Sequence, residues 1–492
     1  MRHVRVGLPS LFIFAILIFA PLGCAAYGDE PPPTRPPGPP TTEQRFVAEW
    51  KTHLAAGGSP DAERADGRWL HVAAQQGFAS AVAILCEAGA DPEIRAPNGA
   101  TALLLAAGVG HEKVAVLLLD KGANVRARLP GGEGALHLAA MEGLPKLAAS
   151  LLDKGTEPDV RTGTDTTPLQ LAATAGSLPL VKLLLERGAD PNAENATFRT
   201  AVTAAIEAGH PTVLALLLEK GASPDPLHPG RPSPLDLTMR VPQGRALMQI
   251  LLDAGADANR RDLEGRYPLH RAAVIENASF LPLLLRNGAN PDAADRSRNT
   301  PLHQAVRDKR RGAVTHLLGA KATPNRKNRA GLTPVHVAVK SGDLTILALL
   351  LEAGGDPNLP DRSRTSPFLQ AALDGSPILV DMLIEKRADL TARDRRGWTA
   401  LHLAVAKGRV AVVESLLFAG ADPDAKTAPD GLTALHLALV AKDVSTALVS
   451  ALIDGRANPN LPDRKGDTAV HYAARLGNDF ILELILDRKS VV

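Results

Sequence analysis

Residues 331–361 read GLTPVHVAVKSGDLTILALLLEAGGDPNLPD, and this stretch decides the fold. Thr333-Pro334 predicts the start of a helix, because a Thr hydroxyl caps free backbone N–H groups and Pro is preset for the first helical position. Gly342 marks the end of that short helix, and a second apolar helix follows that ends in Leu350-Leu351. The Gly-Asp-Pro-Asn segment after it suits a turn. The stretch therefore predicts two short helices and a projecting loop.

This module recurs thirteen times between Trp69 and Val492. Its period is nearly constant, and only the intervals before His270, His436 and His471 are slightly longer than the others. Such short helices are marginal alone, so each module must bury its Leu and Ala face against its neighbours, which predicts a solenoid. The position of His336 is filled along the chain by His71, Leu104, His137, Gln170, Thr203, Asp236, His270, His303, His336, Leu369, His402, His436 and His471.

The period of about 33 residues, the Thr-Pro-Leu-His-like starts and the Gly-Ala-Asp-Pro-Asn-like ends resemble the ankyrin repeat over most of the chain. The resemblance implies an all-α fold, an ankyrin-repeat α-solenoid in which each repeat forms a helix-turn-helix plus a projecting hairpin loop. It also implies a protein that binds other molecules and rarely performs chemistry.

The repeats divide into two blocks, with repeats 1–5 at residues 62–225 and repeats 7–13 at 256–492. Between them lies a degenerate, Pro-rich repeat 6 at 226–255. Proline stiffens its loop and also interrupts the link between its helices at Pro242. This composition predicts a local bend or a weaker junction in the array.

Each end of the array has its own pattern. Residues 43–61 predict an N-terminal capping half-repeat, because four apolar residues are spaced as one helix face: Phe46, Val47, Trp50 and Leu54. At the other end we expect a polar closing face on the last helix from Glu483, Asp487, Arg488 and Lys489.

The segment 1–26 has the order of a secretory signal peptide, with Arg2 and Arg5 ahead of an apolar stretch and small side chains after it. An uncleaved N-terminal anchor is the alternative. Residues 27–42 then form a Pro-rich linker that we expect to be extended. The chain is therefore expected to be exported, and to be periplasmic or tethered to a membrane.

Two cysteines occur, Cys24 and Cys86. The Pro21-Leu22-Gly23-Cys24 run resembles a bacterial lipobox, which implies lipidation of Cys24, although that family usually has Leu where this chain has Pro21. Cleavage after Ala26 is the other interpretation. Cys86 is expected to be a small buried apolar residue, and no disulfide framework is possible once the signal peptide is removed.

The sequence predicts no enzyme, no cofactor and no metal. The histidines recur once per module without carboxylates or cysteines at zinc-ligand spacing, and the resemblance implies that they hydrogen-bond backbone near the module junctions. The repeated aspartates also stand one per module, which favours a role in turns over a calcium site. A formal net charge of +2 gives no case for nucleic acid.

Arginines accumulate in the loops from residue 260 onward. Stacking of the modules would align them as a basic ridge that borders the concave face and grips an acidic partner or an anionic polymer. The alternative is a solvated row of loops in which interleaved Asp cancels part of the charge. Trp398 is either an interface residue or packs on the next loop. The candidate partner-binding residues are Arg261, Arg296, Arg298, Arg326, Arg329, Arg362, Arg364, Arg395, Arg396 and Trp398.

These features together predict an exported, monomeric ankyrin-repeat scaffold that binds another protein through its concave face and loop tips. The alternative function is an envelope-associated protein that uses the basic ridge on a polyanion, such as an acidic polysaccharide or the headgroups of a membrane surface. Nucleic acid is not an expected partner.

Overall fold

The computed structural model describes residues 41–225, 228, 233–276, 278–428, 430–441 and 443–487. The expected signal peptide, Cys24, nearly all of the linker, Arg488 and Lys489 lie outside the described residues. None of the helices in the described part is both long enough and apolar enough to span a membrane. The chain forms two compact units, Met1–Ser59 and Pro60–Val492.

The described part of the first unit is a single helix, α1 (Thr42–Ala55). Thr41 caps it: the Thr41 hydroxyl accepts the N–H of Gln44, and the Gln44 side chain accepts the N–H of Thr41. Phe46 and Trp50 are its buried residues. The second unit begins with a small antiparallel pair of strands, β1 (Glu63–Arg64) and β2 (Gly67–Arg68).

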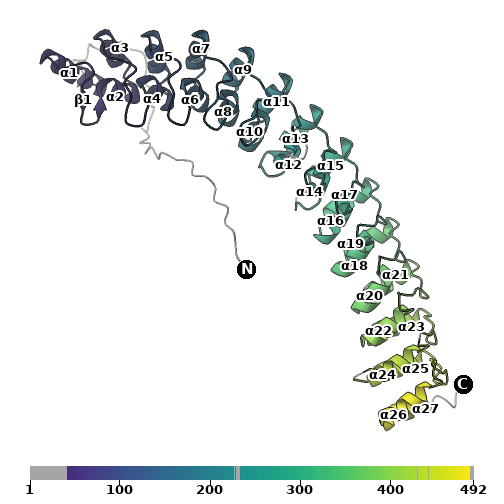
Figure 1. The fold of residues 1–492 in the computed structure, drawn as a ribbon. Helices are drawn as coiled ribbons and strands as arrows, with labels where there is room; N and C mark the ends of the chain where they lie inside the picture. Colours follow the sequence, from purple (N-terminus) through teal and green to yellow (C-terminus); the bar gives the residue numbers. More distant parts are fainter. Residues whose placement is uncertain are drawn as a thin grey trace, which may run out of the picture. The chain divides into compact units, whose positions relative to one another are not determined.

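The rest of the second unit is built from helix pairs, so the expected all-α solenoid is confirmed (Figure 1). The first helices are α2 (Trp69–Gln76), α4 (Ala102–Gly108), α6 (Ala135–Glu142), α8 (Pro168–Ala175), α10 (Ala201–Ala208), α12 (Pro234–Thr238), α14 (Pro268–Ala272), α16 (Pro301–Arg307), α18 (Pro334–Ser341), α20 (Pro367–Asp374), α22 (Ala400–Ala406), α24 (Ala434–Val440) and α26 (Ala469–Leu476).

The second helices are α3 (Ala79–Glu87), α5 (Glu112–Asp120), α7 (Pro145–Asp153), α9 (Leu178–Glu186), α11 (Pro211–Glu219), α13 (Gly244–Asp253), α15 (Phe280–Arg286), α17 (Arg311–Gly319), α19 (Leu344–Glu352), α21 (Pro377–Glu385), α23 (Val410–Phe418), α25 (Thr446–Asp454) and α27 (Asp479–Asp487). Within the second unit, Figure 1 shows the first helices along the inner side of a curved row and the second helices along its outer side.

Capping residues set the helix ends as the sequence indicates. Thr333 accepts the N–H of His336 at the start of α18, and Gly342 ends that helix in the left-handed conformation with φ 69°. The small residues of the first helices are fully buried, which lets neighbouring helices approach closely: Ala106, Ala139 and Ala172 are each 0% exposed. Leu184 and Leu350 of the second helices are fully buried as well. Cys86 in α3 is half-buried rather than buried, and this burial raises the pKa of its thiol.

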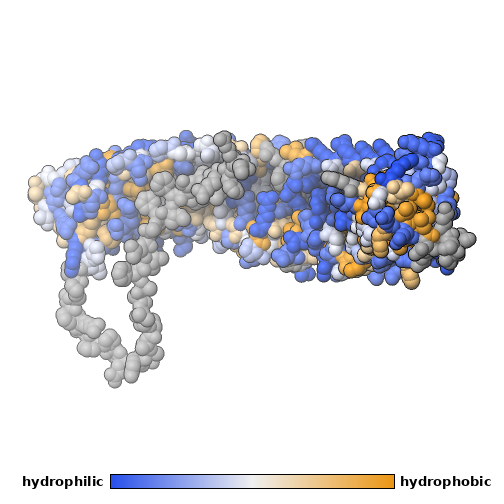
Figure 2. Space-filling view, turned by 90° about the horizontal axis from the view of Figure 1, so that it is seen from below, coloured by the Kyte–Doolittle hydropathy of each residue, from blue (hydrophilic) through white to orange (hydrophobic). Residues whose placement is uncertain are grey.

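On the last helix, Glu483 of the expected polar closing face is exposed, and the side chains of Asp487, Arg488 and Lys489 lie outside the described residues. Three apolar side chains of α26 and α27 are also exposed: Leu476 by 40%, Phe480 by 63% and Leu486 by 41%. Figure 2 shows apolar surface over this end of the molecule.

The sixth module keeps both helices, although its first helix, α12, has only five residues. Its contact with α14 is the sparsest between neighbouring first helices. Gly244 opens α13 directly against this short helix, where an added Cβ would overlap the carbonyl oxygen of Thr238. Only glycine fits in such a position without movement of the backbone.

Candidate binding surface on the loops and first helices

Aspartate side chains fold the loops back on themselves. The Oδ1 atom of Asp295 accepts the N–H groups of Ser297 and Asn299, both at 2.8 Å. Asp361 and Asp394 make the same pair of bonds in their own loops. These carboxylates point into the turn rather than out toward a partner. The arginines between them are therefore the outermost charges of the loops.

Main-chain hydrogen bonds join the tips of consecutive loops. Arg329 donates its N–H to the carbonyl oxygen of Ser297 at 2.8 Å, and Arg362 donates to that of Ala330 at 3.4 Å. Arg464 donates in the same way to Asp430 at 3.1 Å. Loop tips of successive modules are thus neighbours in space, which produces the predicted alignment of the tips.

The structure places all nine predicted arginines on the exposed surface: Arg261, Arg296, Arg298, Arg326, Arg329, Arg362, Arg364, Arg395 and Arg396. Within this set Arg296, Arg329, Arg362 and Arg395 occupy equivalent positions in four successive modules. We call the nine residues the basic ridge. Two of them are partly engaged: Nη2 of Arg395 donates to the carbonyl oxygen of Arg362 at 2.5 Å, and Arg396 binds the carboxylate of Asp394.

Trp398 is half-buried and lies against its own loop. The guanidinium of Arg396 stands 4.1 Å from the centre of the Trp398 ring, a cation–π contact. The same guanidinium binds the Asp394 carboxylate at 3.0 Å. The Trp398 ring also lies 6.5 Å from that of His402 in α22. Trp398 therefore has a packing role within its own loop and against α22.

A second set of loop cations was missed by the sequence analysis. Arg128 donates through Nη1 to the carbonyl oxygens of Gly132, at 3.1 Å, and of Arg161 in the next loop, at 2.7 Å. Arg95, Arg161 and Arg393 make the same two hydrogen bonds, one to a carbonyl oxygen of their own loop and one to a carbonyl oxygen of the next loop. The signal in the sequence was the recurrence of Arg at one module position, as Arg95, Arg128 and Arg161. These cations are also exposed, and each of them joins its own loop to the next one.

The repeated histidines are structural, as expected. The N–H of Thr300 donates to Nδ1 of His303 at 3.1 Å, and Nε2 of His303 lies 3.0 Å from the carbonyl oxygen of Leu332 in the next loop. Because Nδ1 accepts, Nε2 must carry the proton of a neutral ring. Burial lowers the pKa of His303 and of His402 to about 4. Burial likewise lowers the pKa of His137, His270, His336 and His436.

The repeated aspartates act in turns, also as expected. Asp190 accepts the N–H of Asn192 at 2.8 Å, and its own N–H donates to Asp159 of the preceding loop. Among the described residues, no three His, Cys, Asp or Glu side chains are grouped so that they could hold a metal ion.

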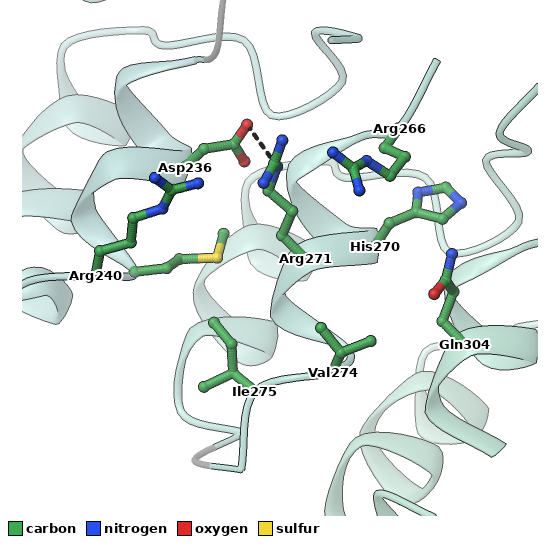
Figure 3. Close-up of a pocket in the computed structure, with 9 residues that line it drawn as sticks. Asp236, Arg240, Arg266, His270, Arg271, Val274, Ile275 and Gln304 are labelled. Carbon is green, nitrogen blue, oxygen red and sulfur yellow. Dashed lines mark ion pairs between the residues drawn. The ribbon is translucent and has the colours of Figure 1, made fainter. Parts of the chain in front are cut away.

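A cavity of about 270 Å³ opens between α12, α14 and α16, on the side of the first helices (Figure 3). Asp236, which stands where other modules carry His, is 4% exposed at this cavity. Its Oδ2 atom pairs with Nε of Arg271 at 3.1 Å, while Nη2 of Arg271 binds Asp262 at 2.8 Å. Burial raises the pKa of Asp236 to about 6 despite the nearby Arg271. An ion-pair chain replaces the usual histidine bridge at this junction.

Comparison with protein families agrees with this architecture. The family model described as "Ankyrin repeats (3 copies)" matches residues 53–129, 70–162, 136–227, 239–328, 335–427 and 411–492. These matches cover more than half of the chain, and the chain belongs to the ankyrin-repeat family. Ankyrin repeats generally mediate protein–protein interaction, and proteins built from them are typically scaffolds without enzymatic activity.

Proposed function

We propose that this chain is an exported ankyrin-repeat scaffold that binds another protein through the inner face of its first helices and the basic ridge. The observation that carries the proposal is the arrangement of the loops, in which aspartates turn inward and arginines at equivalent positions stay exposed. Arginine suits such a surface because its planar guanidinium binds a carboxylate through two parallel hydrogen bonds. The partner surface is therefore acidic.

The helix pairs and loop bonds form without a partner, so little conformational entropy is lost on binding. The side chains of the inner face differ between modules, for example at Glu142, Glu207 and Lys340, while the buried scaffold positions recur. Such variation supplies specificity along the row of first helices.

Affinity capture by the purified chain tests the proposal. The capture should recover a stoichiometric acidic protein, and reversal of four ridge charges (R296E, R329E, R362E and R396E) should weaken binding by roughly tenfold or more, since like-charged surfaces would then repel. A matched control reverses four exposed cations on the second helices, Lys113, Lys182, Arg245 and Arg286. Equal loss in both variants, or undiminished capture by the ridge variant, would rule out the ridge as the binding surface.

The same ridge favours a second candidate function, binding of an anionic polymer or lipid headgroups at the cell envelope. A periodic row of guanidiniums attracts a polyanion, and such binding is screened by salt within a Debye length of about 8 Å at physiological ionic strength. Steep salt dependence with heparin or anionic vesicles, in the absence of a captured protein, would favour this candidate.

Export through residues 1–26 belongs to the same proposal and rests on the sequence alone. Mass spectrometry of the mature chain distinguishes the three processing outcomes. A lipid-modified N-terminal Cys24 indicates a tethered lipoprotein, a chain that begins at Tyr27 indicates ordinary cleavage, and an intact Met1 indicates a retained anchor.

A further inference from the structure

A groove lies between α21 and α23, among the second helices and away from the basic ridge. It is open to solvent and is lined chiefly by Asp381, Ile384, Glu385, Glu414, Phe418 and Ala419. The groove therefore combines three carboxylates with an apolar floor.

Phe418 is the unusual residue of this groove. It is the last residue of α23, and its side chain is 97% exposed. The second helices before and after it end in Glu385 and Asp454, and most of the others also end in Asp or Glu. A fully exposed phenylalanine gains nothing in folding stability from this position, because it is not removed from water. Its presence among acidic neighbours points to a contact with another molecule.

Glu385 also lacks the next-module cation that pairs with its equivalents in three earlier modules, Glu87, Asp120 and Asp153. Glu87 pairs with Lys121 at 3.0 Å, and Asp153 pairs with Arg187 at 2.7 Å, so in each case the cation comes from the next module. Ala419 stands at the corresponding position after Glu385 and offers no charge. Within the described part of the chain, no ion pair is formed by Asp381, Glu385 or Glu414.

We propose that this groove binds a basic segment of a protein partner. A Lys or Arg side chain of that segment lies over the Phe418 ring as a cation–π contact, and its charge is shared with Glu385 and Glu414. A neighbouring apolar side chain of the segment packs on Ile384 and Ala419. The charge of this occupant is opposite to that of a partner for the basic ridge, so the two surfaces select different partners.

The test is fluorescence anisotropy of a fluorescein-labelled peptide, Arg-Lys-Leu-Arg-Arg-Leu, with the purified full chain. Its charge-reversed counterpart, Glu-Glu-Leu-Glu-Glu-Leu, should not bind. In the variant F418E the affinity should fall about tenfold, because the cation–π contact and the apolar surface are lost. Glutamate already ends α19 and α21 in this array, so the substitution introduces a residue type that the position tolerates.

The F418E variant distinguishes binding through the Phe418 ring from attraction by the net charge of the groove alone. If the groove attracted cations only through its net charge, F418E would bind the basic peptide more tightly than the unmodified chain, and that result would overturn the proposal. The double variant E385Q/E414Q should also weaken binding. The matched control is I378E, since Ile378 is 56% exposed on α21 but does not line the groove. Its affinity should be unchanged.

Sedimentation at low salt tests the other occupant, a second copy of the chain. Self-association that disappears in F418E would assign the groove to a contact between copies and would contradict a separate basic partner. The proposal is supported if the chain is a monomer, if I378E binds the basic peptide as tightly as the unmodified chain, and if F418E and E385Q/E414Q bind it more weakly. Circular dichroism of each variant establishes that loss of binding does not reflect loss of fold.

Discussion

Nε2 of His303 lies 3.0 Å from the carbonyl oxygen of Leu332, so the buried imidazole of one layer binds the main chain of the next. Nδ1 of the same ring accepts the N–H of Thr300 within its own layer. A single side chain therefore fixes the start of a helix and the position of the following loop. The array repeats this connection in most of its layers.

Replacement of His303 by Ala should lower the free energy of unfolding by roughly 2–4 kcal/mol, because two buried hydrogen-bonding groups lose their partner. The control is H316A in α17, where the side chain is exposed and bonds only within its own helix. That change should stay within about 0.5 kcal/mol. Urea unfolding measures both, and equal midpoints would contradict the structural role of His303.

Stability should fall as the pH is lowered from 6.5 to 4. The pKa of His303 and of His402 is about 4 in the folded chain, against about 6.5 in the unfolded chain. Between these values the unfolded chain binds protons that the folded chain does not. The stabilisation present above pH 6.5 is therefore lost on acidification, by about 3 kcal/mol per ring at pH 4. Thermal melting at pH 7, 5.5 and 4.5 measures the loss.

The chain itself supplies the control for this pH dependence. Gln170 stands at the histidine position of its module, where Oε1 accepts the N–H of Thr167 and Nε2 donates to the carbonyl oxygens of Ala193 and Arg199. Glutamine does not titrate, so H303Q/H402Q should retain the bonds and show a shallower loss on acidification. An unchanged slope would mean that other groups cause it.

In the sixth module, the stability contributed by Asp236 changes with pH in the direction opposite to that of His303 and His402. The pKa of Asp236 is raised from 3.8 to about 6 by burial, so folding favours the protonated form. This contribution is fully present below pH 3.8 and is lost as the pH rises through 6. D236N should therefore stabilise the chain by up to about 3 kcal/mol at pH 7.5 and by much less at pH 4.5.

Asp262 provides the comparison for D236N in the same ion-pair chain. Its burial would raise the pKa of the carboxyl, but hydrogen bonds from Arg266 and Arg271 outweigh burial and lower the pKa. D262N should thus destabilise the chain at pH 7.5. Urea midpoints of the two variants should move in opposite directions, and a shift in the same direction would exclude this electrostatic account.

G244A should destabilise the chain by several kcal/mol or force a movement of the short helix α12, because the added Cβ would meet the carbonyl oxygen of Thr238. G312A is the matched change in α17, where an added Cβ makes only ordinary contact with Ala278 at 3.7 Å. That variant should be stabilised by about 0.5–1 kcal/mol. Circular dichroism with urea titration distinguishes the two.

Hydrogen exchange should find lower protection in residues 233–245 than in the helices before and after them. The reasons are the short α12 and its sparse contact with α14. This measurement also tests the weaker junction expected from Pro242. Uniform protection across the sixth module would show that the array is continuous there.

The sequence by itself determined the structure of one module, two short helices followed by a loop, and the way in which the modules repeat. Thr333, Pro334 and Gly342 set where a helix begins and ends, and the regular period places equivalent side chains on adjacent layers. These signals are local or periodic, and they are readable without coordinates. For the same reason the loop arginines could be proposed as a ridge before their positions were known.

Only the tertiary structure decided which charges face outward. Asp295 and Arg296 are adjacent in sequence, yet one is bonded within its loop and the other is exposed. Arg128 and Arg329 are both exposed loop arginines, but the guanidinium of Arg128 bonds two carbonyl oxygens, one of them in the next loop. The 97% exposure of the Phe418 side chain is likewise visible only in the structure. Side-chain direction depends on contacts between layers, and a linear pattern does not record those contacts.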